Sequence, residues 1–404
     1  MAAMAAADHP RILLHRFLSL ELCKELEFVH RSCCSVGYRP SVFSTTLSHL
    51  IATNCAHLIL PFLPIRERIK EKVEELFGCE FELFVEFTGL ISWCRGACIG
   101  WHHDDNRPYL KQRDFAAVCY LNNHGKDFEG GMFHFQDGKP SSVCPVAGDA
   151  LIYTADSRNI HCVDEVMDGE RLTLTLWFTR NSAHDEDAKL MALLSQAAEN
   201  YKFDKRECYL PSPASDNMYW FSHDQSGFDI RCARVHLLGY SFCFTSVTND
   251  VKCTTSASSN DSLELLNEPL RLGRGDEIFV KEFVNSLHAL QVLQFYFWKA
   301  PELEKSRRET AGDMESSRSS ILRKSSDMEL MLPCNHELAE TILGAIYYKE
   351  AETIFDWDGL SAAVAEWENY STKLRRDLSS FMPYWLSNET IFYVNPLELQ
   401  ICKE

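Results

Sequence analysis

The chain has 404 residues, 46% of them hydrophobic and 12% aromatic, which is enough for more than one folded domain and excludes a disordered protein. Its 58 acidic side chains outnumber the 40 basic ones and give a formal net charge of −18, which argues against nucleic acid as a partner. We find no signal peptide and no apolar run of the roughly 18 residues that a membrane span needs. We therefore expect an intracellular protein, cytoplasmic or nuclear, that does not bind membranes.

The first 80 residues predict a short strand followed by two helices. The strand is expected in RILLHRFLS, and the first helix in LELCKELEFVHRS, with Ser19 as its N-cap. A second helix is predicted from Ile65, just after a proline, to Phe77, where Gly78 ends it. We expect residues 1–80 to support the domain that follows.

From Phe81 the pattern changes to short runs rich in β-branched and aromatic residues, separated by Gly, Asn, Asp and Pro. The alternation in TLTLWF is typical of a strand with one buried face. Many short strands with turns between them favour a sandwich or a jelly roll, whose open mouth often holds a site. The sequence therefore predicts an α+β protein in which residues 81–182 form the β domain.

The rest of the chain has a weaker pattern. DEDAKLMALLSQAAENY predicts a helix at the start of residues 183–303, a mixed region to which the sequence assigns no role. Residues 304–330 are polar and Ser-rich, which predicts a disordered linker. Helical apolar spacing returns in residues 331–404, so we expect a mainly helical C-terminal region.

The stretch GWHHDDN places two histidines and two aspartates side by side, which favours a metal site because crowded acids and imidazoles need a cation between them. In a strand, residues i and i+2 point to the same side, so His102 with Asp104, or His103 with Asp105, could bind one ion. His161 supplies a third ligand, and two histidines with one carboxylate form the facial triad of non-haem Fe(II) oxygenases.

The order HxD, a distant His161 and then Arg171, with YLN and GG between, resembles the Fe(II)- and 2-oxoglutarate-dependent dioxygenases. The segments RDFAAVCYLN, FEGGMFHF, VAGDALIYTAD and ERLTLTLWF resemble the prolyl hydroxylase branch, especially prolyl 3- and 4-hydroxylase-like catalytic domains. The resemblance implies a double-stranded β-helix, or jelly-roll, core. It also favours His103, Asp105 and His161 as the iron ligands, with His102 and Asp104 facing the opposite side.

The same resemblance implies the cofactors and the reaction. The cofactors would be Fe(II), 2-oxoglutarate as co-substrate and L-ascorbate as reductant. Arg171 would pair with the outer carboxylate of 2-oxoglutarate, Tyr120 would add its hydroxyl, and Thr175 would line the same pocket. Trp177 is interpreted as a core residue. We expect hydroxylation of a residue in a protein or peptide substrate, with proline favoured, and release of succinate and CO₂.

Two other functions remain open. The domain could be a catalytically inactive dioxygenase fold that serves as a protein-binding module, although every expected ligand type is present. It could also be a nucleic-acid demethylase, which the negative charge disfavours. The polar loop at residues 106–113, between the ligand pair and the next strand, could be a substrate lid or a plain connection.

Overall fold

The computed structural model of the chain describes residues 8–33, 36–39, 41–52, 55–78, 84–203 and 357–395, together with five residues between 291 and 299. The chain divides into two compact units, of which the first comprises residues 1–30, 35–227 and 373–404 and the second residues 31–34 and 228–372. The strands named below all belong to the first unit. The predicted linker at 304–330 and most of the predicted flanking regions lie outside the described residues.

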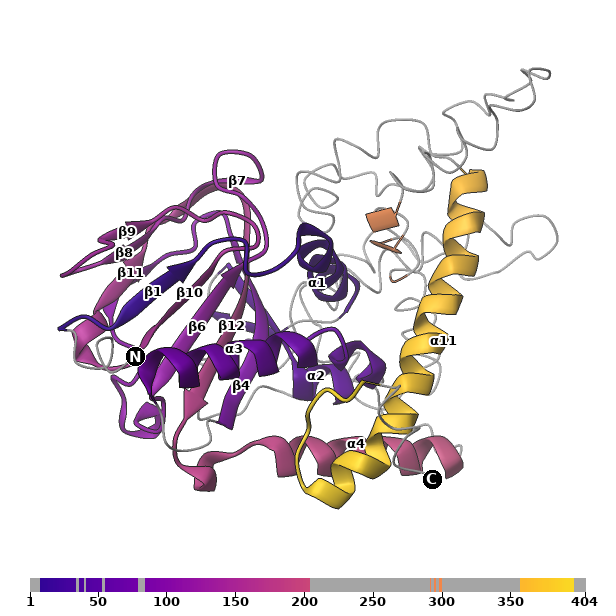
Figure 1. Cartoon of the computed structure of the whole chain (residues 1–404). Coiled ribbons are helices and arrows are strands. Elements are labelled where there is room, and N and C mark those ends of the chain that lie inside the picture. Colours follow the sequence, from indigo (N-terminus) through magenta and orange to yellow (C-terminus); the bar gives the residue numbers. More distant parts are fainter. Residues whose placement is uncertain are drawn as a thin grey trace, which may run out of the picture. The chain divides into compact units, whose positions relative to one another are not determined.

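Two antiparallel sheets form the body of the first unit (Figure 1). The large sheet has the order β1-β10-β6-β12-β4-β3-β2, with β7 paired to β12, and the small sheet has the order β5-β11-β8-β9. The strands are β1 (Arg11–Leu14), β2 (Val36–Arg39), β3 (Val42–Thr46), β4 (Phe84–Cys94), β5 (Ile99–His102), β6 (Phe115–Tyr120), β7 (Phe128–Gly130), β8 (Phe133–Phe135), β9 (Ser142–Val143), β10 (Ala150–Thr154), β11 (His161–Val163) and β12 (Val166–Thr179).

In the part of the chain that the structure describes, helices lie between the first strands, ahead of β4, and again after β12. They are α1 (Leu20–Ser32), α2 (Leu47–Ala52), α3 (Leu63–Phe77), α4 (Asp187–Phe203) and α11 (Trp357–Asn388), with 3₁₀ turns η1 (Ala56–Ile59), η2 (Pro108–Leu110), η3 (Ser157–Asn159) and η4 (Ser182–His184). Among the helices that the structure describes, none has both the length and the apolar character to cross a bilayer. The predicted α+β jelly roll with N-terminal helices is confirmed.

The helix ends follow the expected local chemistry. The Leu22 amide of α1 donates to Ser19 Oγ at 3.2 Å, which satisfies one of the amides that a helix start leaves without an intrahelical partner. Helix α3 ends at Gly78, which adopts a φ of 61° and so supplies the left-handed C-cap that glycine accommodates best. The first cap fixes where α1 begins, and the second fixes where α3 ends.

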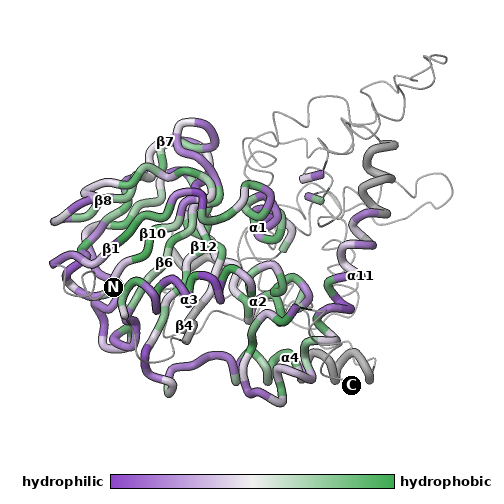
Figure 2. The backbone as a smooth tube through the Cα atoms, in the orientation of Figure 1, coloured by the Kyte–Doolittle hydropathy of each residue, from purple (hydrophilic) through white to green (hydrophobic). Residues whose placement is uncertain are grey.

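Strand β12 lies in the middle of the large sheet, and its alternation defines the two sides of that sheet. Its even-numbered residues share a face with Phe115 of β6, whose ring lies 4.6 Å from that of Phe77 on α3. The other face packs against the small sheet through a buried cluster that includes Tyr153 of β10 and Phe133 of β8. Figure 2 shows that hydrophobic residues follow β10 and β6, whereas the turn beside β7 is hydrophilic.

Candidate metal centre

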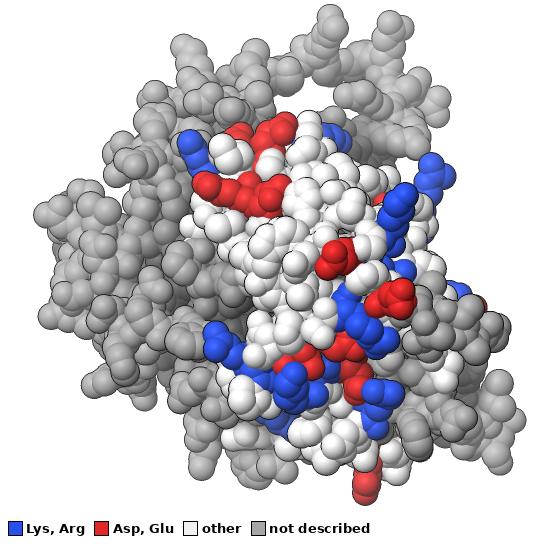
Figure 3. Space-filling view, turned by 90° about the vertical axis from the view of Figure 1, so that its left-hand side faces the viewer, with Lys and Arg blue, Asp and Glu red and all other residues white. Residues whose placement is uncertain are grey.

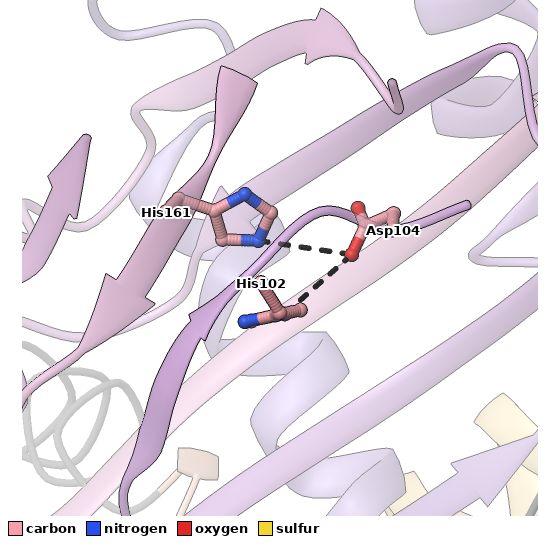
Figure 4. A group of neighbouring side chains, drawn as sticks. All are labelled: His102, Asp104 and His161. Carbon is pink, nitrogen blue, oxygen red and sulfur yellow. Dashed lines mark ion pairs between the residues drawn. The ribbon is translucent and has the colours of Figure 1, made fainter. Parts of the chain in front are cut away.

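Three side chains from the small sheet and the turn beside it meet at one point. His102 is the last residue of β5, His161 is the first residue of β11, and the two are direct cross-strand partners. Asp104 follows β5 by two residues, and its Oδ1 lies 3.8 Å from His102 Nε2 and 3.7 Å from His161 Nε2 (Figure 4). One ligand atom from each residue lies within 4.8 Å of the other two, a spacing that could hold a metal ion.

Backbone carbonyls fix which nitrogen of each histidine faces this point. His102 Nδ1 lies 2.8 Å from Gly100 O, and His161 Nδ1 lies 2.8 Å from Asn159 O. A carbonyl oxygen can only accept, so each Nδ1 carries the proton. In the neutral rings each Nε2 then carries a lone pair, and the two Nε2 atoms lie 3.8 and 3.7 Å from Asp104 Oδ1. This tautomer is the one that metal-ligating histidines commonly adopt, with the second nitrogen donating to a carbonyl.

Burial and neighbouring charges determine the protonation states of His161 and Asp104. His161 is 2% exposed, and burial lowers its pKa to about 4, against an opposing effect of Asp104. Burial disfavours the charged form of Asp104, but the neighbouring His161, His102 and Arg113, with the Trp177 hydrogen bond, hold the pKa of that carboxyl below its usual value. A neutral imidazole beside an ionised carboxylate is the donor set that a divalent metal requires.

The frame expected from the sequence, His103 with Asp105, is not the one that the structure brings to His161. His103 Nδ1 lies 2.5 Å from Asp105 Oδ1, so these two side chains pair with each other. Asp105 also accepts from Lys111 Nζ at 3.0 Å. The reason is the pairing of β5 with β11, because it places His102 opposite His161 and alternation then turns His103 to the other side.

The expected co-substrate residues lie on the face of the large sheet that packs against the small sheet. Arg171 is 2% exposed, and its guanidinium carbon lies 5.4 Å from the centre of the Tyr120 ring. Burial raises the pKa of Tyr120 to about 12, although Arg171 partly opposes the rise, so the hydroxyl keeps its proton and can donate. Thr175 is also buried. It lies four residues after Arg171 on β12, so the two side chains are on the same side of the strand.

Gly131 makes room for the Arg171 side chain. It has a φ of 61°, and a Cβ built on it would lie 2.9 Å from Arg171 Cδ and 3.2 Å from Val166 Cγ2. A contact below 3.0 Å forces a shift, so any larger residue here would displace the guanidinium stem. The GG pair thus makes room for the Arg171 side chain as well as forming the turn.

Two residues that the sequence analysis did not place in the site contact Asp104 directly. Tyr153 donates its hydroxyl to Asp104 Oδ2 at 3.0 Å, and Trp177 donates its indole Nε1 to the same oxygen at 3.2 Å. The interpretation of Trp177 as a core residue is therefore incomplete. Its position six residues after Arg171, on the same strand face, is a signal that could have identified it, whereas Tyr153 has no comparable signal.

Comparison with known proteins points to one superfamily. Residues 90–179 match the family model of the 2OG-Fe(II) oxygenase superfamily. The chain is 27% identical over 228 residues to prolyl 3-hydroxylase 1 of Gallus gallus, a match that covers 45% of this chain and 30% of that protein. It is 34% identical over 128 residues to 2-oxoglutarate and iron-dependent oxygenase domain-containing protein 3 of Rattus norvegicus, covering 30% of this chain and 41% of that protein.

These matches span less than half the length of either relative. Among solved structures, a Pseudomonas putida prolyl-4-hydroxylase aligns with a TM-score of 0.36 and 21% identity over 45% of this chain and 98% of that one. The family model matches this chain from within β4 to the end of β12, and His102, Asp104 and His161 fall within the matched residues.

Proposed function

We propose, from the premise that residues 90–179 belong to the 2OG-Fe(II) oxygenase superfamily, that this protein hydroxylates a residue of a protein or peptide substrate. Proline is the favoured target, because the relatives include a protein named prolyl 3-hydroxylase. The observation that carries the proposal is the convergence of His102, Asp104 and His161 on one point. Each contributes one ligand atom, which is the donor set of the facial triad.

In this proposal Fe(II) is held by His102 Nε2, Asp104 Oδ1 and His161 Nε2. The chemistry of the donors supports the fit, since both imidazoles present a lone pair and the carboxylate is held ionised. A metal held by these three side chains would keep coordination positions open for the co-substrate and O₂. His103 and Asp105, which pair with each other, are then not ligands.

The 2-oxoglutarate site is proposed around Arg171. Its buried guanidinium can bind the outer carboxylate through two parallel hydrogen bonds, and the protonated Tyr120 hydroxyl can donate a third. Thr175 lines the same face and is the weaker candidate. When bound, Fe(II) would activate O₂ as the oxidant: one oxygen atom would enter succinate as 2-oxoglutarate loses CO₂, and the other would convert a substrate C–H bond to C–OH. We include L-ascorbate as the reductant of the iron on the resemblance alone.

Two alternatives are less well supported. An inactive fold acting as a protein-binding module would not need a preserved ligand set, and here both histidine tautomers and the carboxylate are arranged for a metal. A nucleic-acid demethylase would present a basic surface. Figure 3 shows the side of the molecule where β8, β9 and β11 lie. On this face Lys and Arg side chains are intermixed with Asp and Glu, and several acidic side chains gather at one end, so the face is not a basic surface.

The test measures succinate formed from 2-oxoglutarate by the purified protein with Fe(II) and ascorbate, since such enzymes turn over slowly without their primary substrate. We expect His102→Ala to abolish turnover and His103→Ala to retain it. The reverse result would return the ligand pair to His103 and Asp105. If neither wild type nor variants form succinate or bind Fe(II), the oxygenase proposal is wrong and a binding module remains.

The substrate class is tested separately from the chemistry. Proline-containing peptides are incubated with the active protein, and a mass gain of one oxygen on proline is measured by mass spectrometry. Hydroxylation of another residue type, with coupled succinate formation, would keep the oxygenase reaction and replace proline as its target.

A further inference from the structure

The carboxylate of Asp104 is held differently at its two oxygens. Oδ1 faces the Nε2 atoms of His102 and His161, at 3.8 and 3.7 Å, whereas Oδ2 accepts hydrogen bonds from Tyr153 and Trp177. We infer that Tyr153 and Trp177 are positioning residues that keep Asp104 a one-oxygen ligand and so preserve the open coordination positions. This inference rests on the proposed function and deepens it.

The Tyr153 hydroxyl has two possible acceptors, and their chemistry decides between them. It lies 3.0 Å from Asp104 Oδ2 and 3.4 Å from His161 Nε2. A hydroxyl has one proton, and a hydrogen bond to an ionised carboxylate is the shorter and stronger of the two. The proton is therefore donated to Asp104, which leaves the His161 lone pair available to a metal.

Trp177 is itself held in place from outside the site. The guanidinium carbon of Arg113 lies 4.0 Å from the centre of the Trp177 ring, a distance at which a cation binds the face of an indole. Arg113 is the last residue of the loop at 106–113, and Lys111 on the same loop forms an ion pair with Asp105. The loop is thus connected to the metal carboxylate through a stacked arginine and an indole N–H.

The consequence for the metal follows from how carboxylates bind cations. A carboxylate free to rotate can bind through both oxygens and occupy one position more than it does through one. With two donors on Oδ2, binding through that oxygen would require breaking both hydrogen bonds. Without the donors Asp104 could bind through both oxygens and take a coordination position, which should weaken 2-oxoglutarate binding to the metal-loaded protein. Metal binding itself should also weaken, because the hydrogen bonds that orient the Asp104 ligand are lost.

The test uses the whole 404-residue chain loaded with Co(II), whose visible absorption reports its coordination. We expect Trp177→Phe and Tyr153→Phe each to weaken Co(II) binding by about tenfold or more and to change the Co(II) spectrum. We also expect calorimetry to show weaker 2-oxoglutarate binding to the Co(II)-loaded variants. Trp385→Phe is the matched control, because it removes another indole N–H that donates to a backbone carbonyl, Phe392 O, outside the metal cluster.

The outcomes distinguish a failure of this inference from a failure of the proposed function. If wild type binds Co(II) and both variants bind it with unchanged affinity and spectrum, the inference is wrong and the metal site stands. Equal losses in Trp385→Phe and Trp177→Phe would also refute it, because the effect would then be one of general stability. If wild type binds no Co(II), the proposed function fails and the inference with it. Should Trp177→Phe not fold, Tyr153→Phe decides the question.

Discussion

A buried carboxylate outside the metal site is expected to control the stability of the first unit. Asp187, at the start of α4, is 1% exposed, and its Oδ1 lies 2.5 Å from Arg66 Nη2 on α3. Its Oδ2 accepts from Thr390 Oγ1 and from the Ile391 amide, both at 2.8 Å. Asp187 therefore connects α3 to a segment that follows Asp187 by more than 200 residues. All of these residues belong to the first unit.

We expect Asp187→Ala to lower the free energy of unfolding by about 3–5 kcal/mol, because it leaves the Arg66 guanidinium buried without its carboxylate. Glu67 also lies near that guanidinium, but its Oε1 is 4.0 Å from Arg66 Nε. Urea unfolding measures the effect. Glu75→Ala on the same helix removes an exposed ion pair with Lys72 and should cost less than about 1 kcal/mol.

A loss below about 1 kcal/mol in Asp187→Ala would refute the reasoning, since it would mean that water or another group solvates Arg66. A second variant tests the mechanism. Replacing both charges, as Arg66→Met with Asp187→Leu, should recover much of the stability, because a buried pair can often be exchanged for apolar residues at little cost. If the double variant is less stable than Asp187→Ala, the stranded charge is not the cause.

Two further predictions concern pH and the arginine pocket. Burial lowers the pKa of His57 to about 3, so the unfolded chain takes up a proton below pH 6.5 while the folded one does not, and stability should fall as pH drops from 6.5 toward 3. Between pH 7 and pH 5 the protonation of His57 in the unfolded chain lowers the free energy of unfolding by about 2 kcal/mol. The drop in this free energy between the two pH values, measured by urea unfolding, should be smaller by that amount in His57→Gln. An unchanged pH dependence in the variant would contradict the prediction. Gly131→Ala should weaken 2-oxoglutarate binding by at least about tenfold in calorimetry, because its Cβ collides with Arg171. Gly125→Ala, at a φ of 77° with nothing within 4 Å, controls for backbone strain, and equal effects would exclude the collision.

The sequence by itself predicted many of the elements and the kinds of ligand, but it did not predict β2, β3 or α2. Caps at Ser19 and Gly78 depend on side-chain chemistry within a few residues, so the ends of α1 and α3 could be read locally. The alternation of β12 likewise identified a strand with two different faces. The order of the histidines, aspartates and Arg171 carried a family resemblance, and that resemblance predicted one kind of metal chemistry. The predicted domain limits after residue 203 stay predictions, because most of that chain lies outside the described residues.

Only the tertiary structure decided which of the two frames faces His161. Both frames obey the same i, i+2 rule, so the choice depends on the register of β5 against β11, a pairing between residues 59 positions apart. The same holds for Tyr153 and Trp177, which reach Asp104 from two other strands, and for Asp187, whose partners come from α3 and the C-terminal segment. Helix caps and strand alternation depend on residues close together in the sequence, so they can be predicted locally. Strand register and long-range contacts are fixed only when apolar faces from distant segments pack together.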